Sequence, residues 1–169
     1  MSSPRRRRAR WGGTGTPCAL PVSFNLAADW KPKPVSTAGG PGTGFRQGPV
    51  TLACEIDAKP AGHLGFLRVW SQARTSGSTQ QVLDAFLAGQ QHITERHNRR
   101  TTAGVLPAVE TTYLVADGEQ NTAKRERALA VATPHGVILL HLGGLDTTEH
   151  AKMLPAFVLA RRALTALTS

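Results

Sequence analysis

The chain has 169 residues, of which 40% are hydrophobic, 17 are glycine and 11 are proline. This length suits one domain that buries roughly 70% of its unfolded surface, and the glycine and proline content predicts many turns. The longest apolar runs, such as residues 137–140, are far shorter than the ~20 residues of a membrane-spanning helix. We therefore expect no transmembrane segment in this chain.

The net charge of +9 is concentrated at the start of the chain. The first ten residues contain five arginines, namely Arg5, Arg6, Arg7, Arg8 and Arg10. The rest of the chain has fifteen cations and eleven acids. Residues 1–17 are basic and then rich in glycine and threonine, which predicts a disordered arm, whereas residues 18–169 are expected to form a single domain. Such an arm is either a solvated tail or a segment that binds nucleic-acid phosphates without reading sequence.

The two cysteines, Cys18 and Cys54, are too few for a zinc site of their own and lack the spacing of a redox motif. They can pair with each other or remain as two free thiols. A disulfide would contribute on the order of 3 to 4 kcal/mol in the chain-entropy picture and would indicate an oxidising compartment.

In the first half of the chain, residues 22–26 alternate apolar and polar side chains, which predicts a half-buried strand. The sequence Lys-Pro-Lys-Pro at residues 31–34 is expected to interrupt regular structure, and residues 36–44 are expected to form a glycine-rich loop. Residues 50–57 alternate again and are followed by a second strand-like run at residues 64–70. These two runs predict a hairpin.

A helix is predicted to begin at Ser78, because Ser78 and Gln81 have the spacing of a capping box. We expect this helix to extend to about Glu95, with Val82, Phe86, Gly89 and Ile93 on its buried face. A basic turn is expected at residues 95–100.

Three strands are predicted next, at residues 108–116, 125–133 and 136–142, and the apolar residues 137–140 predict a central strand covered on both faces. Asp146 and Glu149 give a second helix-capping signal. Because an interior proline removes a backbone hydrogen bond, Pro155 is expected to delay the regular helix until about Leu154.

Short turns between these elements favour antiparallel pairing and an α+β fold. Three features, namely residues 22–30, residues 106–113 and a final strand followed by an Ala/Leu-rich helix, resemble actinobacterial membrane lipoproteins of the LpqN-like, PsbP-like fold group over about residues 18–168. The resemblance implies an antiparallel sheet flanked by two main helices, a PsbP-like α/β/α sandwich. It also implies an extracytoplasmic location in the cell envelope.

The start of the chain departs from this group. No apolar export segment follows the arginines, and Cys18 follows Pro17, whereas a lipid-modified cysteine normally follows a small residue in an apolar segment. Either the mature domain stands here without its leader, or this member is cytoplasmic.

No catalytic, metal or cofactor site is expected, and each of the six histidines is expected to be a surface or structural residue. Glu110 is expected to be an exposed salt-bridge partner. The basic residues Arg96, Arg99 and Arg100 form the one candidate contact for an acidic ligand or partner, with a solvated helix end as the alternative. Trp30 and Trp70 are expected in the core or at its rim.

The leading hypothesis is therefore a non-enzymatic, lipoprotein-like binding or accessory domain of the cell envelope. It would contact an unidentified envelope protein or ligand through a sheet face or through the surface beside its helices. The alternative hypothesis is a cytosolic protein whose arginine-rich arm binds nucleic acid.

Overall fold

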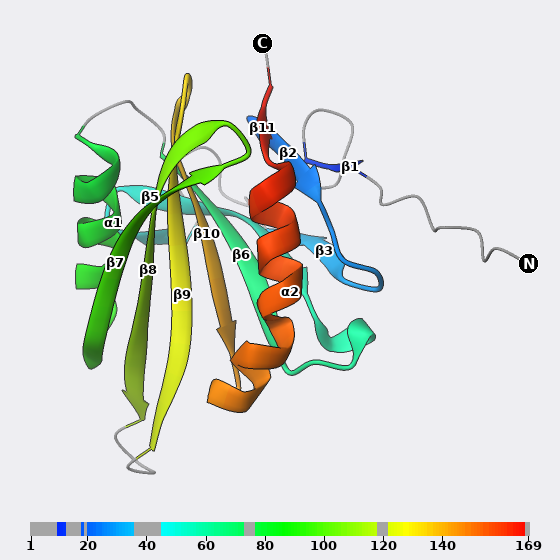
Figure 1. The fold of residues 1–169 in the computed structure, drawn as a ribbon, viewed down its shortest axis with the longest axis vertical. Coiled ribbons are helices and arrows are strands. Elements are labelled where there is room, and N and C mark those ends of the chain that lie inside the picture. The colour runs from blue at the N-terminus through cyan, green and yellow to red at the C-terminus, as the bar shows by residue number, and fades with distance from the viewer. Residues whose placement is uncertain are drawn as a thin grey trace, which may run out of the picture.

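The computed structural model describes residues 10–12, 18, 20–35, 45–72, 77–117 and 122–167. Its main feature is an eight-stranded antiparallel sheet with the order β3-β5-β6-β10-β9-β8-β7, in which β4 also pairs with β5. Helix α1 (Thr79–Ala88) covers one face of the sheet and helix α2 (Thr147–Ala163) covers the other (Figure 1). This arrangement confirms the predicted α+β sandwich.

The strands of the large sheet are β3 (Lys31–Pro34), β4 (Arg46–Gln47), β5 (Val50–Asp57), β6 (Gly65–Gln72), β7 (Ile93–Ala103), β8 (Leu106–Asp117), β9 (Thr122–Thr133) and β10 (Gly136–Gly144). A second, three-stranded sheet contains β1 (Arg10–Trp11), β2 (Val22–Asn25) and β11 (Thr165–Ala166), in the order β1-β2-β11. A short 3-10 helix, η1 (Lys59–Ala61), connects β5 and β6.

Two hydrophobic clusters fill the spaces between the large sheet and the helices. On one side, Val82 and Phe86 of α1 pack with Trp70 of β6. On the other side, Met153 and Phe157 of α2 belong to a larger cluster that also includes β2. All nine residues of β10 are buried, which confirms the predicted central strand covered on both faces.

The predicted strands within residues 22–26, 50–57, 64–70, 108–116, 125–133 and 136–142 are all present, and β5 and β6 form the predicted hairpin. The prediction for residues 31–34 was wrong, because Lys-Pro-Lys-Pro forms strand β3, which pairs with β5. Strand β3 lies at the edge of the sheet, where a proline, which cannot donate a backbone hydrogen bond, is tolerated. Residues 36–44, predicted as a loop, lie outside the described residues.

The prediction that residues 1–17 are disordered was wrong for Arg10 and Trp11. These two residues form β1 and pair with Asn25 and Phe24 of β2. The half-buried Trp11 packs against the core cluster on the α2 side, and this apolar contact offsets the entropy lost on ordering. Arg5 to Arg8 lie outside the part of the chain that the structure describes.

Helix α1 begins as predicted but ends earlier. Ser78 and Gln81 form the capping box, which confirms that prediction. The helix stops at Ala88 instead of about Glu95, and both His92 and Glu95 have a positive φ, which is incompatible with continuing a right-handed helix. The turn predicted at residues 95–100 is also wrong, since these residues belong to β7, and His97 to Arg100 pair with β8.

Helix α2 begins where its capping signal is, because the Asp146 side chain accepts a hydrogen bond from the backbone N–H of Glu149. The prediction that the regular helix starts only near Leu154 was therefore wrong. Pro155 lies inside the helix, and the turns before it run in a different direction from the rest of α2 (Figure 1). Such a bend is the usual way in which a helix accommodates an interior proline.

Cys18 and Cys54 form a disulfide, which confirms the first of the two alternatives. Both residues are buried, and they belong to the hydrophobic cluster on the α2 side. The bond attaches the segment before β2 to strand β5 of the large sheet.

Gly104 connects β7 and β8 at a point where the chain touches α2, and its N–H donates to the carbonyl of Arg161. Its φ is +57, and a Cβ atom here would clash with the backbone oxygen of Leu164. We expect Gly104→Ala to lower the free energy of unfolding by about 2 to 3 kcal/mol in chemical denaturation.

Gly62 provides the matched control, because its φ of +88 is also positive but a Cβ there meets nothing within 4 Å. Gly62→Ala should therefore cost only the backbone strain of about 1 kcal/mol. Equal costs at the two positions would show that the contact of Gly104 with α2 is unimportant for stability.

Candidate functional site

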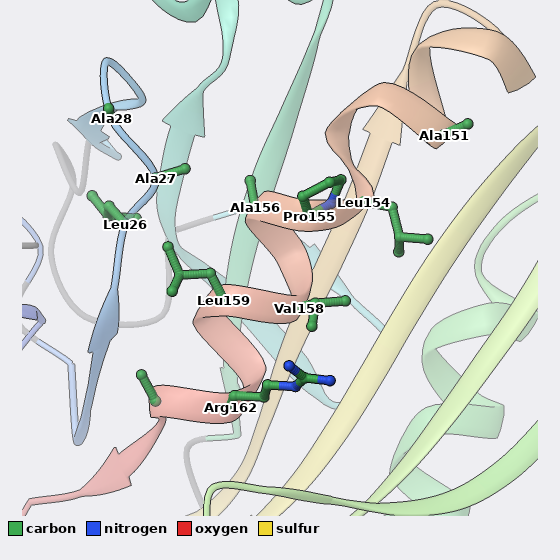
Figure 2. Close-up of a pocket in the computed structure, with 11 residues that line it drawn as sticks. Leu26, Ala27, Ala28, Ala151, Leu154, Pro155, Ala156, Val158, Leu159 and Arg162 are labelled. Carbon is green, nitrogen blue, oxygen red and sulfur yellow. The ribbon is translucent and has the colours of Figure 1, made fainter.

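A groove with a volume of about 1000 Å³ lies between α2 and the segment Leu26–Ala28, which follows β2. Its walls are almost entirely apolar, with one arginine among them: Leu26, Ala27, Ala28, Ala151, Leu154, Pro155, Ala156, Val158, Leu159, Arg162 and Ala163. Figure 2 shows Leu159 of α2 extending toward the segment that carries Leu26. We call it the α2 groove.

The part of α2 that lines the groove is apolar both on the side that packs on the sheet and on the outer side. Met153, Phe157 and Ala160 form the buried stripe that packs on the sheet. Leu154 and Leu159, on other faces of the same helix, are only partly buried and line the groove. Residues 153–160 contain no charged side chain, so this part of α2 lacks the polar outer surface expected of a helix in water. The outer side of α2 is therefore a candidate contact surface.

The three arginines of the predicted anion contact do not lie together, because alternate residues of a strand point to opposite faces of a sheet. Arg96 lies on the α1 side, where it pairs with Asp84 of the helix. Arg99 lies on the α2 side, where its Nη2 is 3.0 Å from Oε2 of Glu110. Arg100 follows Arg99 directly in β7, so it projects to the opposite face. The alternative interpretation, that these three arginines lie at a solvated helix end, is wrong, because all three belong to strand β7.

Glu110 was expected to be exposed, and this prediction was wrong. The residue is only 3% exposed on the α2 side of β8. It was correctly expected to form salt bridges, and its carboxylate pairs with both Arg99 and Arg127. Arg127 and Arg161, which approach this region from β9 and α2, were not predicted as site residues from the sequence.

A second polar group is buried on the α1 side of the sheet. Glu126 of β9 lies 2.7 Å from Nε2 of His141 and 3.4 Å from the hydroxyl of Tyr113. Gln90 and Lys124 complete its surroundings. Burial alone would raise the pKa of Glu126, but the hydrogen bond and charge of His141, together with Lys124, outweigh this effect and lower it to about 2.

Tyr113 and His141 mainly hold this network in place. Burial, and next the charge of Glu126, raise the pKa of the Tyr113 hydroxyl well above its usual range, so Tyr113 remains a neutral donor to the carboxylate. The His141 ring packs edge-on against Phe66 and Phe86. Because the side chains of Glu126 and His141 are 4% and 7% exposed, a substrate has no direct access to them. For His141, the expected structural role fits this arrangement.

The other histidines show no metal-binding arrangement within the described ranges, where no group of three or more potential metal ligands occurs. His92, His97 and His135 are exposed. His150 differs, since this residue of α2 is buried, at 3% exposure. Burial, and then the charges of Arg127 and Arg125, lower its pKa to about 4.

Both tryptophans that were expected in the core or at its rim are buried, Trp30 at 8% exposure and Trp70 at 1%. Over the described residues, neither α1 nor α2 is long and apolar enough to cross a membrane.

A large antiparallel sheet between two helices defines the class of this protein as a PsbP-like α+β fold. The solution structure of cyanobacterial PsbP (CyanoP) from Synechocystis sp. PCC 6803 matches it with a TM-score of 0.61 and 12% identity, over 94% of this chain and 92% of that chain. The crystal structure of LpqN, involved in cell envelope biogenesis of Mycobacterium tuberculosis, matches with a TM-score of 0.55 and 14% identity, over 95% of this chain and 90% of that chain. At these identities the likeness shows the fold alone.

The sequence provides the more specific assignment. Residues 1–164 match the family model described as an uncharacterised lipoprotein, and the chain belongs to this family. No curated protein matches the chain by sequence.

Proposed function

We propose that this protein is a non-enzymatic accessory protein of the cell envelope that binds an apolar or amphiphilic ligand in the α2 groove. The observation that carries this proposal is the apolar outer side of α2, which together with Leu26 and Ala27 forms a concave surface. Sites for small molecules are typically concave and mostly apolar, with volumes of roughly 300 to 1000 Å³. The α2 groove lies at the upper end of this range.

Three observations support an extracytoplasmic location. The chain belongs to a lipoprotein family. The Cys18–Cys54 disulfide requires an oxidising compartment to persist. A protein of the same fold, LpqN, is involved in cell envelope biogenesis. No feature of the comparisons or of the described residues supports the alternative in which an arginine arm binds nucleic acid.

The non-enzymatic character is supported by where the polar side chains lie. The His141 and Glu126 pair is buried under α1, whereas the α2 groove has Arg162 as its one charged lining residue. An apolar wall with one cation suits binding better than acid–base chemistry, which requires a titrating group within hydrogen-bond reach of the substrate.

Replacing Leu159 with aspartate is expected to weaken apolar binding by tenfold or more, because a charged side chain would then face the ligand in place of an apolar one. The measurement is a fluorescence titration with 1-N-phenylnaphthylamine, a neutral apolar probe that arginines do not attract by charge. The wild type should show saturable binding.

Thr148→Asp is the control for this titration, because Thr148 is an exposed residue of the same helix, does not line the groove and undergoes the same change in charge. It should bind the probe like the wild type. If Leu159→Asp binds equally well, or if the wild type shows no saturable binding, the α2 groove is not the ligand site.

A further inference from the structure

Three guanidinium groups from three elements meet on the α2 side of the sheet. Arg99 comes from β7, Arg127 from β9 and Arg161 from the last turn of α2. Arg99 and Arg127 both pair with the buried carboxylate of Glu110. The Nη1 atom of Arg161 donates to the carbonyl of Thr102 at 2.9 Å, which fixes the end of α2 against β7. We call this group the three-arginine cluster.

The three cations are close enough to repel one another. Burial lowers the pKa of Arg127, and the charges of Arg99 and Arg161 lower it further. For Arg161, burial is again the largest cause, followed by the charges of Arg99 and Arg162. Glu110 pairs with two of the three arginines, and its single negative charge leaves an excess of positive charge at a partly buried position.

Two buried side-chain nitrogens in this region have no hydrogen-bond partner among the described residues. One is Nε of Arg127, and the other is Nε2 of His150 in α2. His150 is 3% exposed, and the charges of Arg127 and Arg125 act on it, which places its ring near Arg127, one member of the cluster. Buried polar atoms are usually hydrogen-bonded, so each unpaired one needs an explanation. An additional anion at the cluster would supply an acceptor for Nε of Arg127.

We propose that the three-arginine cluster binds a phosphate group, as a monoester or a diester. The planar guanidinium presents donors in a fork that fits phosphate oxygens in pairs. A phosphate group has enough oxygens to bind several arginines at once, while the carboxylate of Glu110 remains in its present pairs. The side chain of Arg99 is 67% exposed, so the ligand can approach from solvent.

The sheet also provides a matched control. Arg100 is an exposed arginine of the same strand as Arg99 but projects to the opposite face. Arg99→Gln and Arg100→Gln make the same change in charge and side-chain size at neighbouring positions. Only the first removes a member of the cluster.

The test is a titration of the disulfide-bonded protein with inorganic phosphate, followed by NMR signals of the arginine side-chain Nε–Hε groups. We expect saturable shifts for Arg99, Arg127 and Arg161, and about tenfold weaker binding in Arg99→Gln. Arg100→Gln should bind within about twofold of the wild type, as expected for a charge outside the site. Equal weakening in both variants, or no saturable shift of these three signals, would overturn the proposal.

Vesicles distinguish the source of the phosphate group. Binding to phosphatidylglycerol vesicles that is lost in Arg99→Gln, with no binding to phosphatidylcholine vesicles, would identify an anionic lipid headgroup. Binding of inorganic phosphate without vesicle binding would identify a soluble phosphate ester. Both results support the phosphate site, and neither depends on the α2 groove, which is tested with a neutral probe.

Discussion

Removal of the Cys18–Cys54 disulfide is expected to lower the free energy of unfolding by about 3 to 4 kcal/mol. The bond joins residues 36 positions apart, so it closes a long loop and restricts the unfolded chain. It also attaches the segment before β2 to the large sheet. We expect this loss in the double variant Cys18→Ala/Cys54→Ala, measured by urea denaturation.

The reductant provides the control. Adding reductant should lower the stability of the wild type and leave the double variant unchanged, because only the wild type has a bond to reduce. If the reduced and oxidised wild type unfold at the same urea concentration, the disulfide does not stabilise the fold.

Glu126→Gln is expected to lower the free energy of unfolding by about 3 kcal/mol at pH 7. The glutamine imitates the protonated carboxyl group and cannot form the charge-assisted contact with His141. The pKa of Glu126 is about 2 in the folded protein, below the ordinary glutamate value of 4.5. The stabilisation by this carboxylate is therefore fully present above about pH 5 and is lost as the pH falls toward 2.

The difference between wild type and Glu126→Gln should accordingly shrink from pH 5 downward and nearly vanish at pH 2. Glu55→Gln is a suitable comparison, because Glu55 pairs with Arg68 at 3.7 Å and its side chain is 37% exposed. An exposed pair of this kind contributes at most about 1 kcal/mol. A difference between wild type and Glu126→Gln that does not change with pH would show that the charge of Glu126 is not the stabilising feature.

The sequence predicts much of the sheet because alternation is a local pattern. In β5, buried and half-buried residues alternate along all eight positions, as the apolar pattern of residues 50–57 indicates. The same reasoning fails after α1. Ile93 lies four residues after Gly89 and therefore fits a helix, but it begins β7, which has β8 as its partner. The partner strand, which local periodicity does not include, decides the structure of this segment.

The candidate site shows the same limit. Arg99 can be singled out from the sequence, but its neighbours Arg127 and Arg161 come from distant positions and meet it only through the register of the sheet and the docking of α2. The α2 groove was more accessible to prediction. Residues 153–160 of the helix contain no charged side chain, so apolar residues must occupy its outer side as well as its inner side.

Strand β3 has a further consequence for how copies of this protein behave at high concentration. An exposed sheet edge normally offers free N–H and C=O groups to a strand of another chain, which leads to aggregation. Here the edge strand β3 carries Pro32 and Pro34, which have no N–H, in alternation with Lys31 and Lys33. The opposite edge, β7, carries Arg99 and Arg100, whose like charges repel a second copy. Neither edge favours growth of the sheet from one molecule to the next, so crowded copies should not join edge to edge.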